Sequence, residues 1–305
     1  MGMKGIQVGA IVLLALATSA GAATSPRLPG APKCPIFPAS NVWNKRVDKL
    51  PVAANSQAVI GSIGLDVGLH PDFGTVWDGH PNGIPYTIAN KKTQRYRVSF
   101  DYASESDKGP YPIPSKVKIE GGSDHHALIV DRDGCRLYEL YALAKKGQSW
   151  HAGSGAIWNL RSNKLRPAGW TSADAAGLPM LPGLARYDEV ARGHIDHALR
   201  FTVENTRRAY IYPARHFASN QTDPNLPPMG LRVRLRANVD ISGYPRPVRV
   251  ILTALKRYGM IVADNGANWY ISGAPDPRWN DDALHTIGGI TGADFEVVNT
   301  SKLRS

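Results

Sequence analysis

Proline and glycine recur along almost the whole chain and limit what it can fold into. The 305 residues contain 23 prolines and 30 glycines. Proline ends helices because it lacks a backbone donor, and glycine favours turns. Their density indicates many short strands joined by turns. We therefore predict a mainly β fold, an antiparallel β-sandwich of the jelly-roll type with one or two short helices; a β-barrel is the alternative.

Local patterns place the individual elements. Alternating or continuous apolar runs predict strands at 96–102, 125–131, 135–143, 148–160, 194–203, 231–241, 260–263 and 268–272. Asp and Gly at 132–134 and at 264–266 predict two hairpins. Apolar residues at helical spacing predict a helix at 247–258, and Thr and Ser caps predict a short one at 171–176.

The N-terminus resembles a secretory signal. Lys4 precedes a short apolar run, and small residues follow it around Ala22. We predict a signal peptide at 1–23, because the run is too short for a convincing membrane anchor. A flexible leader at 24–33 and a single β-rich domain at 34–305 follow. The mature protein is expected to be secreted or periplasmic, with no stable membrane insertion.

The chain carries a formal net charge of +11. An acidic polymer is one partner that such a charge suits, and a charge that simply maintains solubility is the blander interpretation, which we favour. Nucleic acid is not expected, because the basic residues form no run and the protein is exported.

Two cysteines are present, Cys34 and Cys135. In an exported chain a single pair is most simply a disulfide. It would close a loop of about 100 residues, for which chain entropy allows roughly 4 to 5 kcal/mol.

Six of the nine histidines lie between residues 125 and 216, among carboxylates and tryptophans. Histidine beside a carboxylate suits acid/base chemistry. His126 and Glu139 lie on neighbouring predicted strands, and Glu139 shares a face with apolar residues, where a carboxylate is costly unless it is paired or functional. A structural Glu–His pair is the competing interpretation.

Two tryptophans, Trp150 and Trp158, flank His151 and a glycine-rich bend. Exposed aromatic rings stack on sugars, although core packing is the more frequent role of tryptophan. The bend lacks the Gly-x-Ser-x-Gly motif of serine hydrolases.

Asp188 and His197 come next, followed by a group of cationic and aromatic residues that includes Arg215 and His216. His197 is either a site residue or a core histidine, and Arg215 binds either a substrate carboxylate or an internal one. No zinc motif is present, so no catalytic metal is predicted. The acidic loop at Asp281 and Asp282 leaves room for structural calcium, although its spacing does not match an EF-hand.

Three stretches resemble a family of exported bacterial proteins with no assigned activity: CPIFPASNVWN, GWTSADAAGLPMLPGLARYDEV and YGMIVADNGANWYISGAPD. The basic alternating strand at 231–241 and WHAGSGAIWN are also loosely similar to jelly-roll polysaccharide lyases. This second likeness implies a polysaccharide as substrate, by analogy alone.

The sequence therefore predicts an exported carbohydrate-active enzyme that cleaves a polysaccharide by acid/base chemistry, as a glycoside hydrolase or a polysaccharide lyase. The catalytic candidates are Glu139, Asp188, His126, His151 and His197, and the substrate-binding candidates are Trp150, Trp158, Arg215 and His216. Two alternatives stay open: a non-catalytic carbohydrate- or cell-surface-binding protein, and a metal-dependent enzyme that uses the histidines.

Overall fold

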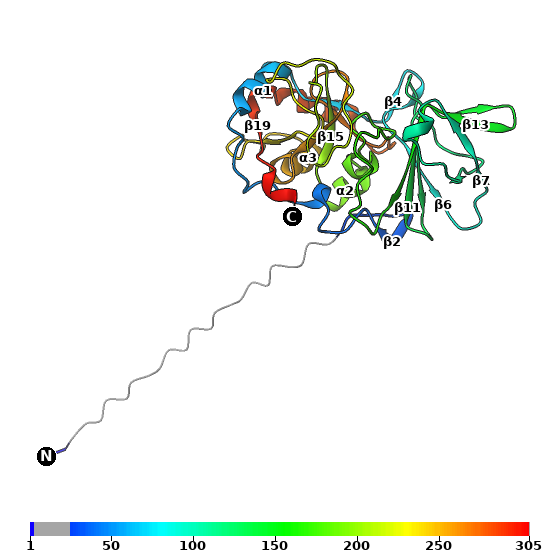
Figure 1. Ribbon diagram of the computed structural model, residues 1–305. Coiled ribbons are helices and arrows are strands. Elements are labelled where there is room, and N and C mark those ends of the chain that lie inside the picture. The colour runs from blue at the N-terminus through cyan, green and yellow to red at the C-terminus, as the bar shows by residue number, and fades with distance from the viewer. Residues whose placement is uncertain (3–24, 305) are drawn as a thin grey trace.

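A computed structural model describes residues 1–2 and 25–304, so the predicted signal peptide at 1–23 lies almost wholly outside the described residues. Figure 1 shows two lobes side by side. The sheet lobe holds β1, β2 and β6 to β14; the helical lobe holds β3, β15 to β19 and the four α-helices. The chain passes from the sheet lobe to the helical lobe, returns, and crosses once more.

The sheet lobe is built on a four-stranded sheet whose order is β14 (Ser154–Asn159), β11 (Arg136–Tyr141), β10 (Ala127–Asp131) and β6 (Tyr86–Ala89). Smaller sheets surround it: β12 (Ala144–Lys146), β13 (Ser149–Ala152) and β8 (Val98–Phe100); β1 (Arg27–Leu28) and β2 (Ala31–Pro35); β7 (Arg95–Tyr96) and β9 (Tyr111–Pro112). Strand β10 is buried along its whole length because apolar clusters cover both faces of the sheet.

The helical lobe contains a six-stranded sheet whose order is β19 (Phe295–Val297), β16 (Arg232–Leu235), β17 (Met260–Asn265), β15 (Leu199–Val203), β18 (Tyr270–Ser272) and β3 (His70–Asp72). The α-helices pack around it: α1 (Ser56–Ile63), α2 (Tyr187–Arg192), α3 (Arg246–Arg257) and α4 (Asp281–His285). A hairpin of β4 (Val76–Trp77) and β5 (His80–Pro81) stands beside the lobe junction.

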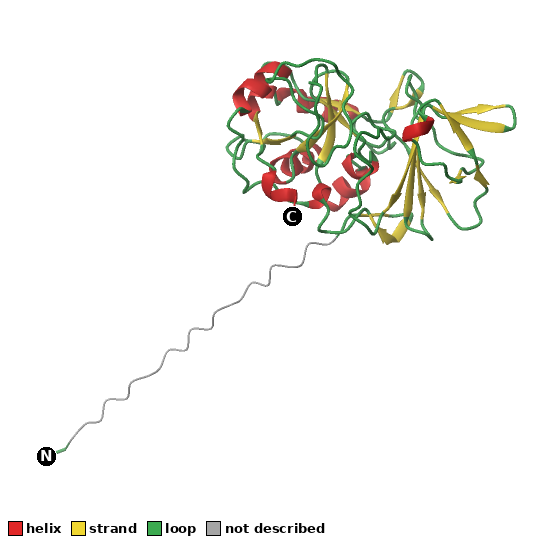
Figure 2. Cartoon of the chain, in the orientation of Figure 1, coloured by secondary structure: helices red, strands yellow, loops and turns green. Residues whose placement is uncertain are grey.

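Six single turns of 3-10 helix complete the described elements: η1 (Val42–Asn44), η2 (Ala103–Glu105), η3 (Leu181–Gly183), η4 (Thr286–Gly289), η5 (Gly292–Asp294) and η6 (Ser301–Arg304). Figure 2 shows most helical segments in the helical lobe and the strands fanning through the sheet lobe.

The prediction of a mainly β protein is confirmed, since strand accounts for 28% of the chain and helix for 18%. The predicted sandwich is not confirmed. Four strand pairs run parallel, namely β10 with β6, β13 with β8, β15 with β17 and β18 with β3, so the sheets are mixed.

Predictions from local signals hold best. The hairpin predicted at 125–143 forms as an antiparallel pair of β10 and β11. The predicted 247–258 helix is α3, and its apolar stripe of Val248, Ile251, Leu252 and Leu255 is fully buried. The disulfide between Cys34 and Cys135 also forms, and it ties the start of the described fold to the β10–β11 turn.

The predicted hairpin at 260–272 is wrong. β17 and β18 both form, but β15 lies between them, pairing parallel with β17 and antiparallel with β18. Strand β15 itself begins at Leu199 rather than at the predicted 194, and the predicted flexible leader instead contains part of the β1–β2 pair.

The strand predicted at 231–241 is shorter than expected, and one of its arginines is buried. Strand β16 is only four residues long, and the Arg232 side chain is 1% exposed. Its guanidinium donates to the backbone carbonyls of Val42, Lys45 and Tyr258. Burial of a cation is tolerated there because carbonyl oxygens satisfy its donors.

Among the described residues, no helix combines the length and the apolar character needed to cross a membrane.

Candidate functional site

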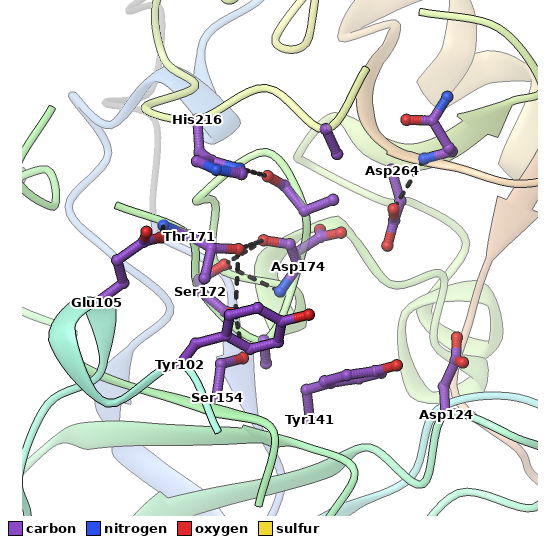
Figure 3. Close-up of a pocket in the computed structure, with 14 residues that line it drawn as sticks. Tyr102, Glu105, Asp124, Tyr141, Ser154, Thr171, Ser172, Asp174, His216 and Asp264 are labelled. Carbon is purple, nitrogen blue, oxygen red and sulfur yellow. Dashed lines mark hydrogen bonds between the residues drawn. The ribbon is translucent and has the colours of Figure 1, made fainter. Parts of the chain in front are cut away.

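A cavity of 390 Å³ opens where the two lobes meet (Figure 3). The sheet lobe contributes residues from η2, from the segment before β10, and from β11 and β14; the helical lobe contributes three loop or strand-end segments. The lining residues are Tyr102, Glu105, Asp124, Tyr141 and Ser154 from the first lobe, and Thr171, Ser172, Ala173, Asp174, Ala175, His216, Ala218, Asp264 and Asn265 from the second.

Asp264 stands at the end of β17. The strand brings it out of a fully buried run, and its side chain remains 25% exposed toward the cavity. One carboxylate oxygen accepts from the backbone N–H of Asn265 at 2.8 Å. The pKa of Asp264 is raised to about 7, first because burial penalises the charge and second because the Asp174 carboxylate repels it. Asp264 is therefore an acid that can hold or release a proton near neutral pH.

Arg200 lies behind this carboxylate. Its guanidinium donates two hydrogen bonds of 2.9 Å to Asp174, whose side chain is fully buried, and a third of 2.6 Å to Ser272. Its contact with Asp264 is a single one of 3.3 Å. Because a bidentate pair is the stronger arrangement, Arg200 interacts more strongly with Asp174 than with Asp264. The remaining attraction lowers the Asp264 pKa less than burial raises it.

Asp124 reaches the cavity from the sheet lobe. It is exposed, and its backbone carbonyl accepts from the N–H of Ala142, which anchors the 124–126 segment to the end of β11. Tyr141, on β11, lines the same cavity and points its hydroxyl toward the side where Asp124 lies (Figure 3). Partial burial raises the pKa of Tyr141, and the charges of Asp124, Tyr102 and Asp264 raise it further. Both carboxylates therefore act on one phenol, from opposite lobes.

His216 lines the opposite part of the cavity (Figure 3). Its Nδ1 lies 2.8 Å from the carbonyl oxygen of Ala175 and donates to it. This bond leaves Nε2 as the acceptor nitrogen of the neutral ring. His216 is the one sequence-predicted site residue that lines the cavity.

The 171–177 segment forms the cavity floor as a series of turns, so the predicted short helix at 171–176 is wrong. The Ser172 hydroxyl contacts the carbonyls of Asp174 and Leu178, and Gly177 adopts a φ of 67°. Ser and Thr side chains that bond to nearby backbone compete with helix formation, which explains the departure. Ser154 donates to the Ser172 carbonyl at 2.6 Å and so joins the two lobes.

His126 sits behind the floor and is buried. Its Nδ1 lies 2.5 Å from Glu120, and its Nε2 lies 3.1 Å from the carbonyl of Ala173. Burial lowers the His126 pKa, but the hydrogen bond and charge of Glu120 outweigh it, so the pKa is raised overall. With both nitrogens facing acceptors, His126 braces the floor rather than contacting a bound molecule.

Glu139 is fully buried and does not line the cavity. Its carboxylate accepts from the backbone N–H groups of Met180 at 2.9 Å and Leu181 at 3.0 Å, and from Trp158 Nε1 at 3.0 Å. Burial raises its pKa to about 7, against the opposing effect of these donors. The structure thus gives Glu139 three internal partners that hold η3 against β11.

Two other predicted carboxylate and histidine candidates lie on or beside α2, outside the cavity. Asp188 pairs with Arg192 at 2.9 Å, and the buried His197 contacts Glu189 at 3.0 Å. His151, on β13, contacts Ser99 at 2.9 Å and Asp101 at 3.1 Å on the outer part of the sheet lobe. These three predicted residues are therefore not brought together.

The predicted aromatic pair is separated as well. Trp150 belongs to β13 and packs edge-on against Tyr96, whereas Trp158 belongs to β14, is buried, and packs against Phe37. The two strands lie in different sheets because the chain bends at 153. Of the predicted cations, Arg215 donates to the carbonyl of Arg166 at 2.9 Å and does not line the cavity.

Across residues 25–304, no three His, Cys, Asp or Glu side chains gather in a way that could hold a metal ion. The loop considered for calcium instead starts helix α4, and Asp281 accepts hydrogen bonds from the backbone and hydroxyl of Thr75.

The cavity residues that are missing from the sequence-predicted site include Asp264, Asp124, Asp174, Tyr102 and Tyr141. The Asp-Asn-Gly sequence at 264–266 predicts a hairpin turn at Asp264 rather than a site residue. The local signal for Asp264 is a carboxylate that directly follows the apolar run 260–263. The sequence alone does not show that this end of the strand lies at the lobe junction.

No protein-family model, no curated protein and no solved structure matches the chain.

Proposed function

We propose that the protein is an exported glycoside hydrolase that cleaves a polysaccharide in the cavity between the lobes. The observation that carries the proposal is that one cavity is lined both by Asp264, a carboxyl group with a pKa of about 7, and by Asp124 on the facing lobe. Glycoside hydrolysis needs one carboxyl that donates a proton and one carboxylate that activates water or attacks the sugar.

In this scheme Asp264 gives its proton to the glycosidic oxygen as the bond to the anomeric carbon breaks. The leaving sugar departs as an alcohol. A water molecule adds to the anomeric carbon and loses a proton to Asp124, which leaves a hydroxyl group on that carbon and completes the hydrolysis. Release of that proton to solvent and reprotonation of Asp264 complete the cycle.

The aromatic rings at the cavity suit a sugar. Tyr102 is 56% exposed, and Tyr141 presents its phenol beside both carboxylates. Tyrosine offers an apolar ring face together with a hydroxyl, which matches the mixed surface of a pyranose. His216 provides an acceptor nitrogen that can hold a sugar hydroxyl.

Hydrolysis is favoured over the lyase reaction by the charges at the cavity. A lyase needs a cation to neutralise a uronate carboxylate, and none of the 14 described lining residues is Lys or Arg. Two guanidinium groups contact lining residues from behind, and both are already bound to carboxylates: Arg200 to Asp174 and Arg166 to Asp107. The same charges argue against the anionic substrate that the overall basic composition suggested.

Export is part of the proposal and has its own support. The Cys34–Cys135 disulfide is typical of proteins that fold in an oxidising compartment. The predicted signal at 1–23 would direct the chain there, to the periplasm or the medium.

The test is mass spectrometry of soluble products after incubation of the purified protein with neutral, amine-bearing and acidic polysaccharides. Fragments whose masses include one added water per cleaved bond support the hydrolase. Fragments lighter by one water identify a lyase and contradict the proposal. No fragments from folded protein would favour a carbohydrate-binding protein without catalysis.

A further inference from the structure

A second cavity, of 280 Å³, adjoins the first. It is lined by the β4–β5 hairpin, by the 120–124 segment and by Asp72 on β3. Asp124 lines both cavities and so forms their common wall. A polysaccharide bound in the first cavity could therefore extend into the second cavity, toward the β4–β5 hairpin.

Trp77 is the conspicuous residue of this second cavity. Its side chain is 74% exposed, whereas Trp43, Trp158, Trp269 and Trp279 are at most 5% exposed. Burial of so large an apolar side chain is strongly favourable, and tryptophan is highly buried on average. One exposed aromatic residue needs no explanation by itself. Trp77 is a candidate binding residue because it lies on an ordered hairpin and lines a cavity.

The hairpin fixes the backbone at Trp77. Asp78 and Gly79 have φ angles of 48° and 76°, which is the two-residue turn that matches strand twist, and Trp77 pairs with His80 across it. The backbone of Gly74 donates to Asn82 at 3.0 Å, and Asn82 donates back to Thr75 at 3.2 Å. A backbone that is already ordered before binding reduces the entropy lost when Trp77 binds a ligand.

The hairpin also closes on the segment that carries Asp124. A Cβ atom at Gly121 would lie 2.7 Å from Cβ of His80, so only glycine allows this approach. Trp77, from the hairpin, and Asp124, from the 120–124 segment, thus line one cavity.

The described lining of the second cavity contains Asp72, Asp78, Glu120 and Asp124, with no Lys or Arg. Glu120 is paired with His126, and burial raises the pKa of Asp72, but Asp78 and Asp124 leave a negative surface. Like charges repel, and the repulsion is strongest where water is partly excluded. A sugar that carries a carboxylate is therefore disfavoured, and a neutral or amine-bearing sugar is suited.

We infer that the second cavity is a sugar-binding subsite in which Trp77 stacks on a ring of a polysaccharide that lacks carboxylate groups. This inference rests on the proposed function only for the position of the cleaved bond, and it concerns binding rather than turnover.

The test is isothermal titration calorimetry of the Asp264→Asn protein, which should leave the ligands uncleaved. The ligands are four 1,4-linked tetrasaccharides, built from glucose, glucosamine, N-acetylglucosamine or galacturonic acid. At least one of the first three is expected to bind, and the galacturonate tetramer more weakly. Adding Trp77→Ala should weaken the best ligand roughly tenfold, equivalent to about 1.4 kcal/mol. Trp77→Phe should restore most of the affinity. Val76→Ala is the matched control, since Val76 is 60% exposed on the same hairpin and does not line the cavity.

Equal affinity of the Trp77→Ala and Val76→Ala proteins overturns the inference, as does tightest binding of galacturonate or binding of none of the tetramers. Titration of the wild-type protein on ice repeats the comparison if Asp264→Asn lowers solubility. Binding that depends on Trp77, without any cleavage product, would contradict the proposed hydrolase activity and support the sugar-binding subsite. Cleavage that does not depend on Trp77 would support the hydrolase activity and contradict the subsite.

Discussion

The carboxylate of Asp264 lies 3.3 Å from the guanidinium of Arg200, yet its pKa is raised to about 7. An adjacent cation would ordinarily lower an aspartate pKa. Here burial is the larger effect, and Asp174 both engages Arg200 and repels Asp264. The arrangement gives one carboxyl group at a cavity wall a pKa near neutral pH, where it can hold or release its proton.

Asp174→Asn should shift the pH–rate profile of hydrolysis. Removing the Asp174 charge takes away a repulsion and frees Arg200 for Asp264, so the Asp264 pKa falls. Since the proton donor must be protonated, the rate should decline at a lower pH, by a shift of the order of one unit. Initial rates between pH 4 and 9 measure this shift. An unchanged high-pH limb would mean that Asp264 does not control it.

Asp264 also links stability to pH. In the unfolded chain it loses its proton near pH 4, whereas in the folded protein it keeps it up to about pH 7. The folded state binds more protons in that range, so this stabilising contribution is full below pH 4 and is lost as the pH rises through 7. The melting temperature of Asp264→Asn, relative to wild type, should therefore increase from pH 4 to pH 8. A pH-independent difference contradicts the raised pKa.

Glu139→Gln should destabilise the fold without changing turnover per folded molecule. An amide has one acceptor oxygen, so it cannot replace a carboxylate that serves Met180, Leu181 and Trp158. One buried donor left unsatisfied costs about 1–3 kcal/mol. Urea unfolding and initial rates separate the two effects. A large loss of rate in protein that remains folded would return Glu139 to the catalytic candidates.

The Glu120–His126 pair should stabilise the protein most in mildly acidic solution. The Glu120 pKa is lowered overall, because the His126 interactions outweigh the effect of burial, and the His126 pKa is raised. The contribution of Glu120 is lost as the pH falls through its lowered pKa; that of His126 is lost as the pH rises through its raised pKa. Glu120→Gln should thus lower the melting temperature more at pH 5 to 6 than at pH 9. Equal losses at both values would argue against a charged pair.

Removal of the disulfide tests how far the β1–β2 pair depends on it. Cys34 and Cys135 are 101 residues apart, and loss of a native disulfide typically costs about 2–5 kcal/mol. The double variant Cys34→Ala/Cys135→Ala should show that loss in urea unfolding. No change in the free energy of unfolding would show that the packing of β2 alone holds this end of the fold.

The sequence predicts elements whose causes are local. Helix α3 follows from an apolar stripe and a glycine stop, and the β10–β11 hairpin follows from a turn between two apolar runs. The order of strands in a sheet has no local cause and could not be predicted. Strand β15, which comes much earlier in the chain, lies between β17 and β18. Arg232 misleads for a similar reason, since the carbonyls that satisfy it come from distant loops.

The site was hard to predict for the same physical reason. Asp264 depends on Arg200, which is 64 residues away, and on Asp174, which is bound to that arginine. His216 is predictable because it lies in a local group of cationic and aromatic residues. Glu139 was correctly judged costly to bury, but its partners are backbone donors of its own fold rather than a bound molecule.

The central claim is that Asp264 is the proton donor for hydrolysis. The most direct measurement compares the turnover of wild type and Asp264→Asn on the polysaccharide that yields fragments, with Asp276→Asn as control, since Asp276 pairs with Arg278 outside both cavities. The account predicts a loss of about 10²- to 10⁴-fold for Asp264→Asn alone, with the fold retained by circular dichroism. Equal turnover of the folded Asp264→Asn and wild-type proteins would contradict it.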